Sequence, residues 1–342
     1  MRISGTVKSS ARLACFGATL ALGICFASPQ AHAQTPSTTS GQAFPSKPIR
    51  IVVPFPAGGT TDVVARLVAQ RMGESMGQPV VVDNRGGAGG ALGADIVAKS
   101  NPDGYTLLMH NITFPLSSVA QTLAKRSPFD AERDFAGVSI AVYVPFVFTA
   151  NPSVAAKDLR EFTALMRGNA NLKYNYGSTG PGSAMHVLGE TLKRDGKFDM
   201  AHVAYKGAAP LKLELLSGRI QFGGDQLSTS LQEIRGGQLK ALATTGAKRI
   251  AILPDVPTVR EQGFPALEFE GFNGLFAPAK TPKAVLDRPQ REAAQAVRHP
   301  DLVKRFADLG AESVGSSGEA QKTMLVRLMQ QFTSVIREMK LD

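Results

Sequence analysis

A strand followed by a glycine turn and the start of a helix recurs along this chain and constrains its fold more than any other feature. The residues P-F-P-A-G-G-T-T-D at 54–62 end a β-rich run and open a helical pattern. Similar glycine turns follow the runs at 80–84, 174–178 and 202–206. Such a turn points free backbone N–H groups and the positive end of a helix dipole beyond the strand end. This arrangement holds small anions, so it favours a solute-binding protein over an enzyme.

The rest of the chain alternates in the same way. Short β-rich runs bounded by turn residues predict strands at 49–55, 80–84, 106–111, 174–178, 202–206, 220–223 and 239–244. Helical periodicity predicts helices at 62–76, 91–100, 183–194, 210–217, 228–235, 282–298 and 301–309. This alternation predicts an α/β protein with parallel sheets, helices on both faces, and ligand sites beyond the carboxyl ends of the strands.

A last helix has the clearest pattern. Ser316 and Glu319 fit a capping box at its start. An apolar stripe follows, made of Leu325, Leu328, Met329, Phe332, Ile336 and Met339. A partner-binding surface would also produce such a stripe, but packing within the same domain is the commoner reason. We expect the stripe to belong to the core.

Residues 1–33 have the parts of a secretory signal peptide. The first part is basic, an apolar stretch covers 13–27, and A-H-A at 31–33 predicts cleavage before Gln34. The apolar stretch is short for a membrane span. Cys25 would suit a lipid anchor, but the bulky Ile24 before it argues against one. We expect a soluble, periplasmic protein, exported by a cleaved signal peptide.

Residues 34–46 are rich in Ser, Thr, Gly and Pro and predict a disordered leader. Both cysteines, Cys15 and Cys25, lie in the signal, so the mature chain can form no disulfide and no thiolate metal site. About 300 mature residues favour two domains of roughly 100 to 200 residues each.

The net charge is mildly positive. The whole chain has 38 Lys and Arg against 28 Asp and Glu, a formal charge of +10, and removal of three basic signal residues leaves +7. Neither a dense cluster of Lys and Arg nor any Trp is present, so we expect no nucleic-acid partner.

Three partial motifs point towards cofactors or catalysis. G-x-G-x-x-x-G at 87–93 has one residue too many for a dinucleotide fingerprint. The scattered histidines lack metal-ligand spacing, so we expect no metal and no cofactor. An exported hydrolase could use Ser178 or Ser183, but no G-x-S-x-G elbow occurs, and the sequence does not show that a histidine meets a serine. His186 is expected to support the site from behind at most.

Several stretches together resemble one family, the tripartite tricarboxylate transporter substrate-binding proteins, TctC-like receptors also called the Bug family. They are P-F-P-A-G-G-T-T-D at 54–62, N-R-G-G-A-G-G at 84–90, P-D-G-Y-T-L at 102–107, A-x-V-x-Y-K-G at 201–207, Asp225, L-P-D-V-P-T-V at 253–259 and G-L-F-A-P-A-K-T-P at 274–282. The resemblance covers nearly all of the mature chain in order.

The resemblance implies a two-lobed clamshell of the type II periplasmic-binding-protein kind, often called a Venus flytrap, with a mostly parallel sheet flanked by helices in each lobe. Lobe 1 would comprise 45–144 plus 273–342, and lobe 2 would comprise 145–272. The chain would cross between the lobes near 143–149 and 268–274, which would act as hinges. A monomer is expected.

The resemblance also implies a site for a small carboxylate between the lobes. From the first turn it would take Phe55, Ala57, Gly58, Gly59 and Thr60. From lobe 2 it would take Ser178, Thr179, Gly180, Ser183, Lys206 or Gly207, and Asp225. Gly223 and Gly224 stand where the family has bulkier residues, which predicts a larger pocket. Asp62 is expected either to stabilise the helix start or to bind a ligand donor.

The function that follows is periplasmic capture of a small organic carboxylate and its delivery to the integral membrane permease of a tripartite tricarboxylate transporter, without catalysis. Two alternatives stay open from the sequence. One is an exported ligand sensor for a signalling partner, and the other is an exported hydrolase. The sequence does not choose among dicarboxylates, tricarboxylates, aromatic acids and acidic amino acids.

Overall fold

The computed structural model describes residues 44–169 and 171–339. The predicted signal and most of the predicted leader lie outside the described residues. The last residues of that leader belong to the folded part, since the ring of Phe44 packs 4.9 Å from that of Tyr105 and the Ser46 N–H donates to the Tyr105 hydroxyl at 2.9 Å.

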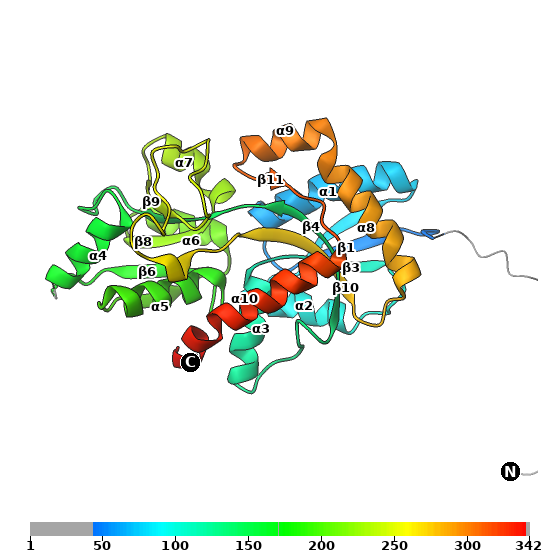
Figure 1. Cartoon of the computed structure of the whole chain (residues 1–342), viewed down its shortest axis with the longest axis horizontal. Coiled ribbons are helices and arrows are strands. Elements are labelled where there is room, and N and C mark those ends of the chain that lie inside the picture. Colours follow the sequence, from blue (N-terminus) through cyan, green and yellow to red (C-terminus); the bar gives the residue numbers. More distant parts are fainter. Residues whose placement is uncertain (1–43, 170, 340–342) are drawn as a thin grey trace, which may run out of the picture. The chain divides into compact units, whose positions relative to one another are not determined.

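The first sheet has the strand order β11-β4-β10-β3-β1-β2 (Figure 1). Its strands are β1 (Ile49–Val53), β2 (Val80–Asn84), β3 (Thr106–Asn111), β4 (Phe135–Tyr143), β10 (Phe272–Pro278) and β11 (Glu312–Ser313). Strand β1 is parallel to β2 and β3, whereas β10 is antiparallel to both β3 and β4. We call the part of the protein built on this sheet lobe 1.

The second sheet has the order β7-β6-β8-β5-β9. Its strands are β5 (Phe146–Ala150), β6 (Asn175–Ser178), β7 (Ala201–Ala204), β8 (Phe222–Gln226) and β9 (Lys240–Thr244). Strand β6 is parallel to β7 and β8, and β5 is antiparallel to β8 and β9. We call the part built on this sheet lobe 2.

The predicted α/β class with two sheet-based lobes is confirmed, but each sheet is mixed. The parallel pairs join strands that the sequence predicted, namely β1 with β2 and β3, and β6 with β7 and β8. The antiparallel pairs involve β4, β5 and β10, which the strand–turn–helix pattern did not identify as strands because no glycine turn and helix follow them directly. The exact lobe boundaries stay a prediction, and β10 begins at Phe272, one residue before the expected return to lobe 1.

The chain passes between the sheets twice, and the two passages lie side by side. Strand β4 ends at Tyr143, which pairs with Phe272 at the start of β10. The Val144 N–H donates to the Gly271 carbonyl at 2.7 Å. These residues fall inside both segments that the sequence predicts as hinges.

Helices flank both sheets. In lobe 1 they are α1 (Thr60–Met76), α2 (Ala91–Ala98), α3 (Thr113–Leu123), α8 (Lys283–Arg298), α9 (Pro300–Asp308) and α10 (Gly318–Glu338). In lobe 2 they are α4 (Leu159–Gly168), α5 (Ala184–Gly196), α6 (Ala208–Leu216) and α7 (Leu231–Arg235). Short 3-10 turns form at η1 (Ala88–Gly90), η2 (Leu227–Thr229) and η3 (Pro265–Leu267).

Alternate residues of the lobe 1 strands enter different apolar clusters, as the pleat of a strand requires. Leu107 and Met109 face the cluster that α1, α8 and α9 cover. Leu108 lies between them in sequence and faces the opposite cluster, which extends to Phe148 and Phe222 of lobe 2. The cluster that contains Leu108 therefore packs against both sheets.

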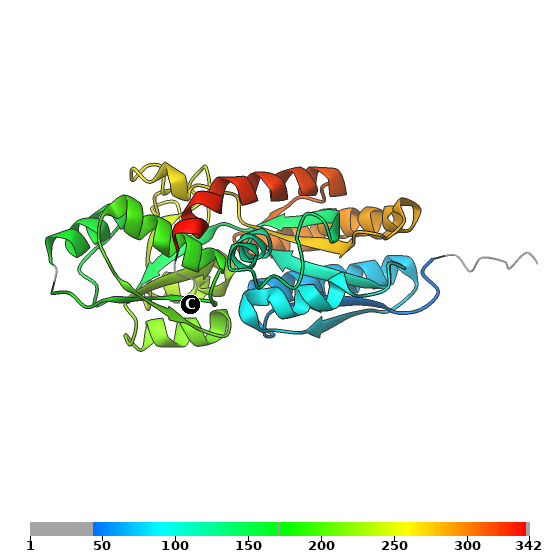
Figure 2. The ribbon, with the colours of Figure 1, turned by 90° about the horizontal axis from the view of Figure 1, so that it is seen from below.

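Helix α10 confirms the core interpretation of its apolar stripe. Leu325, Leu328, Phe332 and Ile336 are buried, and the helix runs from strand β4 and helix α3 to helix α5 (Figure 2). The predicted capping residue is wrong by one position. The side chain of Ser317 accepts from the Ala320 N–H, while that of Ser316 accepts from the Ile140 N–H at 2.9 Å.

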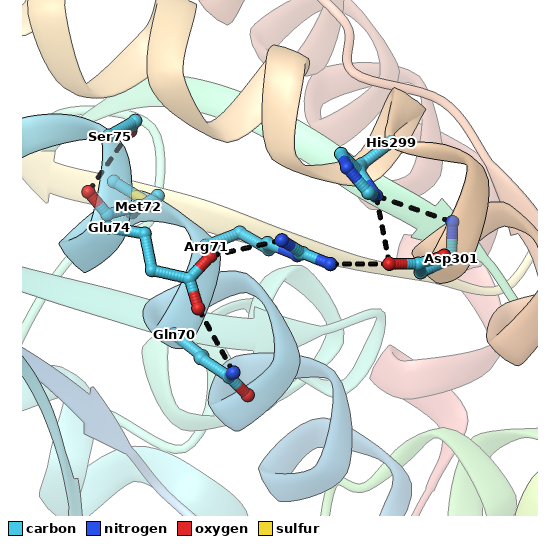
Figure 3. A network of polar contacts seen from close by, with 7 residues as sticks. All are labelled: Gln70, Arg71, Met72, Glu74, Ser75, His299 and Asp301. Carbon is cyan, nitrogen blue, oxygen red and sulfur yellow. Dashed lines mark hydrogen bonds and ion pairs between the residues drawn. The ribbon is translucent and has the colours of Figure 1, made fainter.

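A polar network fixes α1 against α9 (Figure 3). The guanidinium of Arg71 contacts Asp301 at 2.6 Å and Glu74 at 3.0 Å. His299 precedes α9, and its Nδ1 accepts from the Asp301 N–H at 3.3 Å. Because α1 carries the first glycine turn at its other end, this network helps to hold that turn in place.

No helix in the described part of the chain combines the length and the apolar composition needed to cross a membrane.

Candidate ligand-binding site

The first glycine turn joins β1 to α1 and is fixed by one carboxylate. Gly58 has φ +87°, in the left-handed region that favours glycine, and its N–H donates to the carboxylate of Asp62 at 3.0 Å. The same carboxylate accepts from Asn84 at 2.9 Å and pairs with Arg66 at 3.0 Å. Asp62 therefore stabilises the turn. Because the Gly58 N–H donates to Asp62, this N–H is already engaged within the turn.

The charge of Asp62 is stabilised by these donors. Burial raises its pKa, but hydrogen bonds from Arg66, Gly58 and Asn84 outweigh burial and hold the pKa below its usual value. Helix α1 begins at Thr60, and its first intrahelical bond runs from the Val63 N–H to the Gly59 carbonyl. The N–H groups before Val63 are thus at the open end of the helix.

The second turn follows β6 and is held from behind by histidines. The hydroxyl of Ser178 is fully buried, lies 2.6 Å from Nε2 of His202, and lies 3.1 Å from both the N–H and the carbonyl of Gly180. The Gly182 N–H donates to Nδ1 of His186 at 3.0 Å. The two imidazoles stack with their centroids 3.9 Å apart and an interplanar angle of 9°.

Both of these histidines are neutral at ordinary pH. Burial, with smaller contributions from the neighbouring His202 and Lys193, lowers the pKa of His186 to about 3. Burial also lowers the pKa of His202 to about 4. The ring of Tyr176 lies 4.9 Å from His202, and its hydroxyl donates to Glu190 at 2.5 Å.

Between the two turns lies a small polar cavity, which we call the inner chamber. Its volume is about 30 Å³. Its walls come from both lobes and consist of Phe55, Pro56, Ala57, Gly59, Thr60, Thr61, Asn111, Thr179, Ala208, Ala209, Asp225 and Gln226. Its lining residues include no Lys or Arg, so an anion held there would depend on backbone N–H groups, amides and hydroxyls.

A larger space adjoins it, which we call the outer chamber. Its volume is about 530 Å³. Phe55, Pro56 and Thr179 line both chambers and stand between them. The remaining walls are Pro54, the glycine run 86–90, Gly180, Pro181 and the segment 204–207, which includes Lys206.

The two lobes touch around these chambers. The Thr60 hydroxyl is hydrogen-bonded to Ser228 and lies 3.1 Å from the hydroxyl of Thr229. A Cβ placed on Gly89 would lie 2.9 Å from the carbonyl of Pro181, so only glycine allows this approach without a shift. The described conformation is therefore closed around the inner chamber.

The chambers bring together most of the residues that the sequence singled out. Phe55, Ala57, Gly59, Thr60, Thr179 and Asp225 line the inner chamber. Gly180, Lys206 and Gly207 line the outer chamber. Gly58, Ser178 and Ser183 line neither chamber. Ser183 is fully buried just before α5, and its hydroxyl has no partner among the described residues.

Gly223 and Gly224 do not enlarge the pocket. A Cβ on Gly224 would lie 2.1 Å from the Val147 carbonyl, and one on Gly223 would lie 3.2 Å from the Gly177 carbonyl. Glycine is needed there because neighbouring strands approach closely.

Sequence reasoning missed three polar residues of the inner chamber, namely Thr61, Asn111 and Gln226. Asn111 ends strand β3, so the rule that ligands bind beyond strand ends could have found it. Its backbone N–H donates to Nδ1 of His110 at 2.9 Å. His110 is fully buried, and burial lowers its pKa to about 3, so this neighbour is neutral.

Asp225 is the one acidic residue of the inner chamber lining. Its carboxylate lies 3.5 Å from the Thr229 hydroxyl, the limit of a hydrogen bond. Burial raises its pKa to about 6, although the Gln226 N–H and the Thr229 hydroxyl act in the opposite direction. The pKa of Asp62 is shifted in the opposite direction because an arginine and two further hydrogen-bond donors stabilise its charge.

One solved structure with this fold is that of the periplasmic binding protein BugD, which shares 33% identity over 86% of this chain and 98% of its own, with a TM-score of 0.79. Another, described as a periplasmic transporter, shares 36% identity over 88% of this chain and 99% of its own, with a TM-score of 0.82. MatC from Rhodopseudomonas palustris with bound malate shares 30% identity over 86% of this chain and 100% of its own, with a TM-score of 0.80. Rpa4515 of R. palustris with adipate shares 27% identity over 86% of this chain and 98% of its own, with a TM-score of 0.77. The fold therefore defines a two-lobed periplasmic binding protein.

The family follows from the sequence comparisons. The family described as "Tripartite tricarboxylate transporter family receptor" (TctC) matches residues 64–341. The protein BugT of Bordetella pertussis is 33% identical over 87% of this chain and 91% of its own length. A protein encoded between tcbD and tcbE in Pseudomonas sp. strain P51 is 34% identical over 91% of this chain and 93% of its own length. This chain belongs to the tripartite tricarboxylate transporter receptors, the Bug family.

Proposed function

We propose that this protein is a periplasmic receptor that captures a small organic carboxylate between its lobes and delivers it to the membrane permease of a tripartite tricarboxylate transporter. Export would use the predicted signal at 1–33. The ligand would lie between the two glycine turns, and the lobes divided at 144/145 and 272/273 would open and close around it.

The inner chamber carries this proposal. The amino-terminal end of α1 contributes Thr60 and Thr61 to its wall, and the open end of a helix favours a negative charge. Asn111 and Gln226 add side-chain amides from the ends of β3 and β8. Two members of the same fold were solved with dicarboxylic acids, malate and adipate. Family membership supports the permease partner.

A hydrolase has one observation in its favour, the 2.6 Å contact between Ser178 and His202. The serine hydroxyl, however, is fully buried and also bonds to Gly180 of its own turn. A nucleophile needs access to its substrate and a nearby oxyanion site. The contact fits better as a support for the turn.

Native mass spectrometry of the mature protein taken from its own periplasm tests binding, followed by thermal unfolding with a panel of carboxylates. We expect a co-purified small acid that raises the melting temperature. The absence of both a bound mass and a thermal shift across the panel would contradict the proposal. Uptake of that acid by cells with and without the gene separates transport from sensing, because a sensor leaves uptake by an existing permease unchanged.

The variant Gly59→Val tests whether the ligand binds between the two glycine turns. A Cβ at this position has only the Pro56 carbonyl near it, at 3.9 Å, so the added side chain disturbs the ligand space and spares the turn. We expect affinity for the co-purified acid to fall at least tenfold, about 1.4 kcal/mol. Gly168→Val is the matched control, since its Cβ meets no atom within 4 Å and it is the last residue of α4. Equal affinity in both variants would place the ligand elsewhere.

A further inference from the structure

A chain of hydrogen bonds fixes the orientation of the amides at the floor of the inner chamber. Gln226 Oε1 accepts from Asn273 Nδ2 at 3.1 Å, and Asn273 Oδ1 accepts from the Thr61 hydroxyl at 2.8 Å. The Thr61 oxygen accepts from Asn111 Nδ2 at 3.2 Å. Asn111 Oδ1 accepts from the Thr113 N–H at 2.9 Å. The amide oxygens are thus engaged along the whole chain.

The groups that these hydrogen bonds leave available to a ligand are hydrogen-bond donors. An amide NH₂ group has two hydrogens. Asn111 uses one of them on Thr61, and Gln226 uses one on the Phe272 carbonyl at 3.4 Å. Both residues line the chamber, so the second hydrogen of each is available to an acceptor there. The first turn of α1 adds backbone N–H groups, so most of the wall is built to meet a carboxylate.

Asp225 is the exception in this wall. It is a carboxylate on the same chamber, and its donors are the Thr229 hydroxyl at 3.5 Å and the backbone N–H of Gln226. A carboxylate removed from water needs donors to remain charged. A ligand carboxylate alone would supply none and would add a second negative charge nearby. A ligand that also has its own donor would satisfy Asp225 and the surrounding amides together.

We infer that the inner chamber selects carboxylates that bear a hydroxyl or ammonium group close to the carboxylate, and that Asp225 accepts the hydrogen bond from that group. This inference rests on the proposed function, because it assumes that the ligand carboxylate occupies the inner chamber. The ligand class is thereby a carboxylate with an adjacent hydroxyl or ammonium group. The amides and N–H groups of the chamber bind the carboxylate, and Asp225 binds the adjacent group.

Matched triplets of acids test the selection at three sizes. They are succinate, malate and aspartate; glutarate, 2-hydroxyglutarate and glutamate; and phenylacetate, mandelate and phenylglycine. Within each triplet only the substituent beside a carboxylate changes. By calorimetry on the mature protein, we expect the hydroxy or amino member of at least one triplet to bind about tenfold more tightly than the unsubstituted acid, as one good hydrogen bond allows.

Variants of Asp225 assign the preference to this residue. Asp225→Ala is expected to reduce the preference to less than about threefold, because the acceptor is gone. Asp225→Asn keeps an acceptor oxygen but no charge, so it is expected to preserve a preference for hydroxyl and to lose one for ammonium. Asp255→Asn is the control, an exposed lobe 2 aspartate whose replacement changes the net charge equally. Thermal unfolding verifies that each variant is folded.

The outcomes separate the inference from the proposed function. If unsubstituted acids bind as well as or better than their partners, or if the preference survives in Asp225→Ala, the inference is wrong and the carboxylate receptor stands. If none of the nine acids binds, the result contradicts the inference, while the acid detected by native mass spectrometry still decides the receptor proposal.

Discussion

The two glycine turns that border the inner chamber look alike in sequence but are stabilised by opposite chemistry. The lobe 1 turn is held by the charged carboxylate of Asp62, which bonds to Gly58, Asn84 and Arg66. The lobe 2 turn is held by the neutral imidazoles of His186 and His202. The same backbone arrangement can therefore be fixed from behind by an ion pair or by uncharged rings, and the two lobes should respond differently to mutation and to acid.

Removal of the Asp62 carboxylate should have the largest effect. Asp62→Ala leaves the Gly58 N–H without its acceptor and removes one of the acceptors of Asn84 and Arg66, which keep the Phe55 carbonyl and Asn84 Oδ1. We expect a loss of roughly 3 kcal/mol in the free energy of unfolding, as for other buried partners of an ion pair. Urea denaturation measures it. Asp287→Ala, which removes an exposed pair with Lys283, should cost at most about 0.5 kcal/mol. Similar losses in both variants would show that Asp62 does not hold the turn.

Acid should affect the lobe 2 turn before the Asp62 carboxylate of the lobe 1 turn, although the buried His110 of lobe 1 adds to the loss in the same pH range. The folded protein lowers the pKa of His186 to about 3 and that of His202 to about 4, so between pH 6.5 and 4 the unfolded chain binds more protons than the folded one. Stability therefore falls as pH falls through this window, by roughly 2 kcal/mol after allowance for partial solvent access. Asp62 contributes to acid loss only below its usual pKa near 3.8, because its own pKa is lowered.

Denaturation curves at several pH values measure this loss. The double variant His186→Asn with His202→Gln removes both titrating groups and keeps polar atoms near the turn, so its stability should change less between pH 6.5 and 4. Asp225 works against the histidines, because its raised pKa makes the folded protein more stable as pH falls from 6 towards 3.8. An unchanged pH dependence in the double variant would show that these two histidines do not cause the loss of stability in acid.

The smallest effect concerns backbone conformation. Gly58 has φ +87° and no atom within 4 Å of an added Cβ, so Gly58→Ala costs only the left-handed conformation, roughly 1 kcal/mol. In the lobe 2 turn, Gly182 has φ +71° and an added Cβ would lie 3.0 Å from the Cβ of Ala120. We expect Gly182→Ala to cost more than Gly58→Ala in thermal denaturation. The reverse order would show that crowding does not restrict the second turn.

The sequence predicted the parts of the site that lie close together along the chain. The strand, the turn at 54–59 and the start of α1 form one local pattern, and Asp62 could be assigned to the helix start because it lies within that pattern. The family motifs extended this to lobe 2. Six of the predicted residues line the inner chamber for this reason.

The sequence could not predict contacts that depend on strand register and on the approach of the lobes. Ser178 and His202 are 24 residues apart and meet because β6 and β7 are parallel and adjacent. Asn273 reaches Thr61 and Gln226 only because β10 returns from lobe 2 beside β3. A strand pattern fixes which face a side chain takes, but it does not choose the neighbouring strand.

The closed edges of the inner chamber have a consequence for kinetics. Thr60 is hydrogen-bonded to the hydroxyls of Ser228 and Thr229, and Gly89 lies against Pro181. A molecule that reaches from the inner into the outer chamber leaves more readily while these contacts are broken. Its residence time then depends on how often the lobes separate. An acid that fits the walls better prolongs its stay by making that separation rarer.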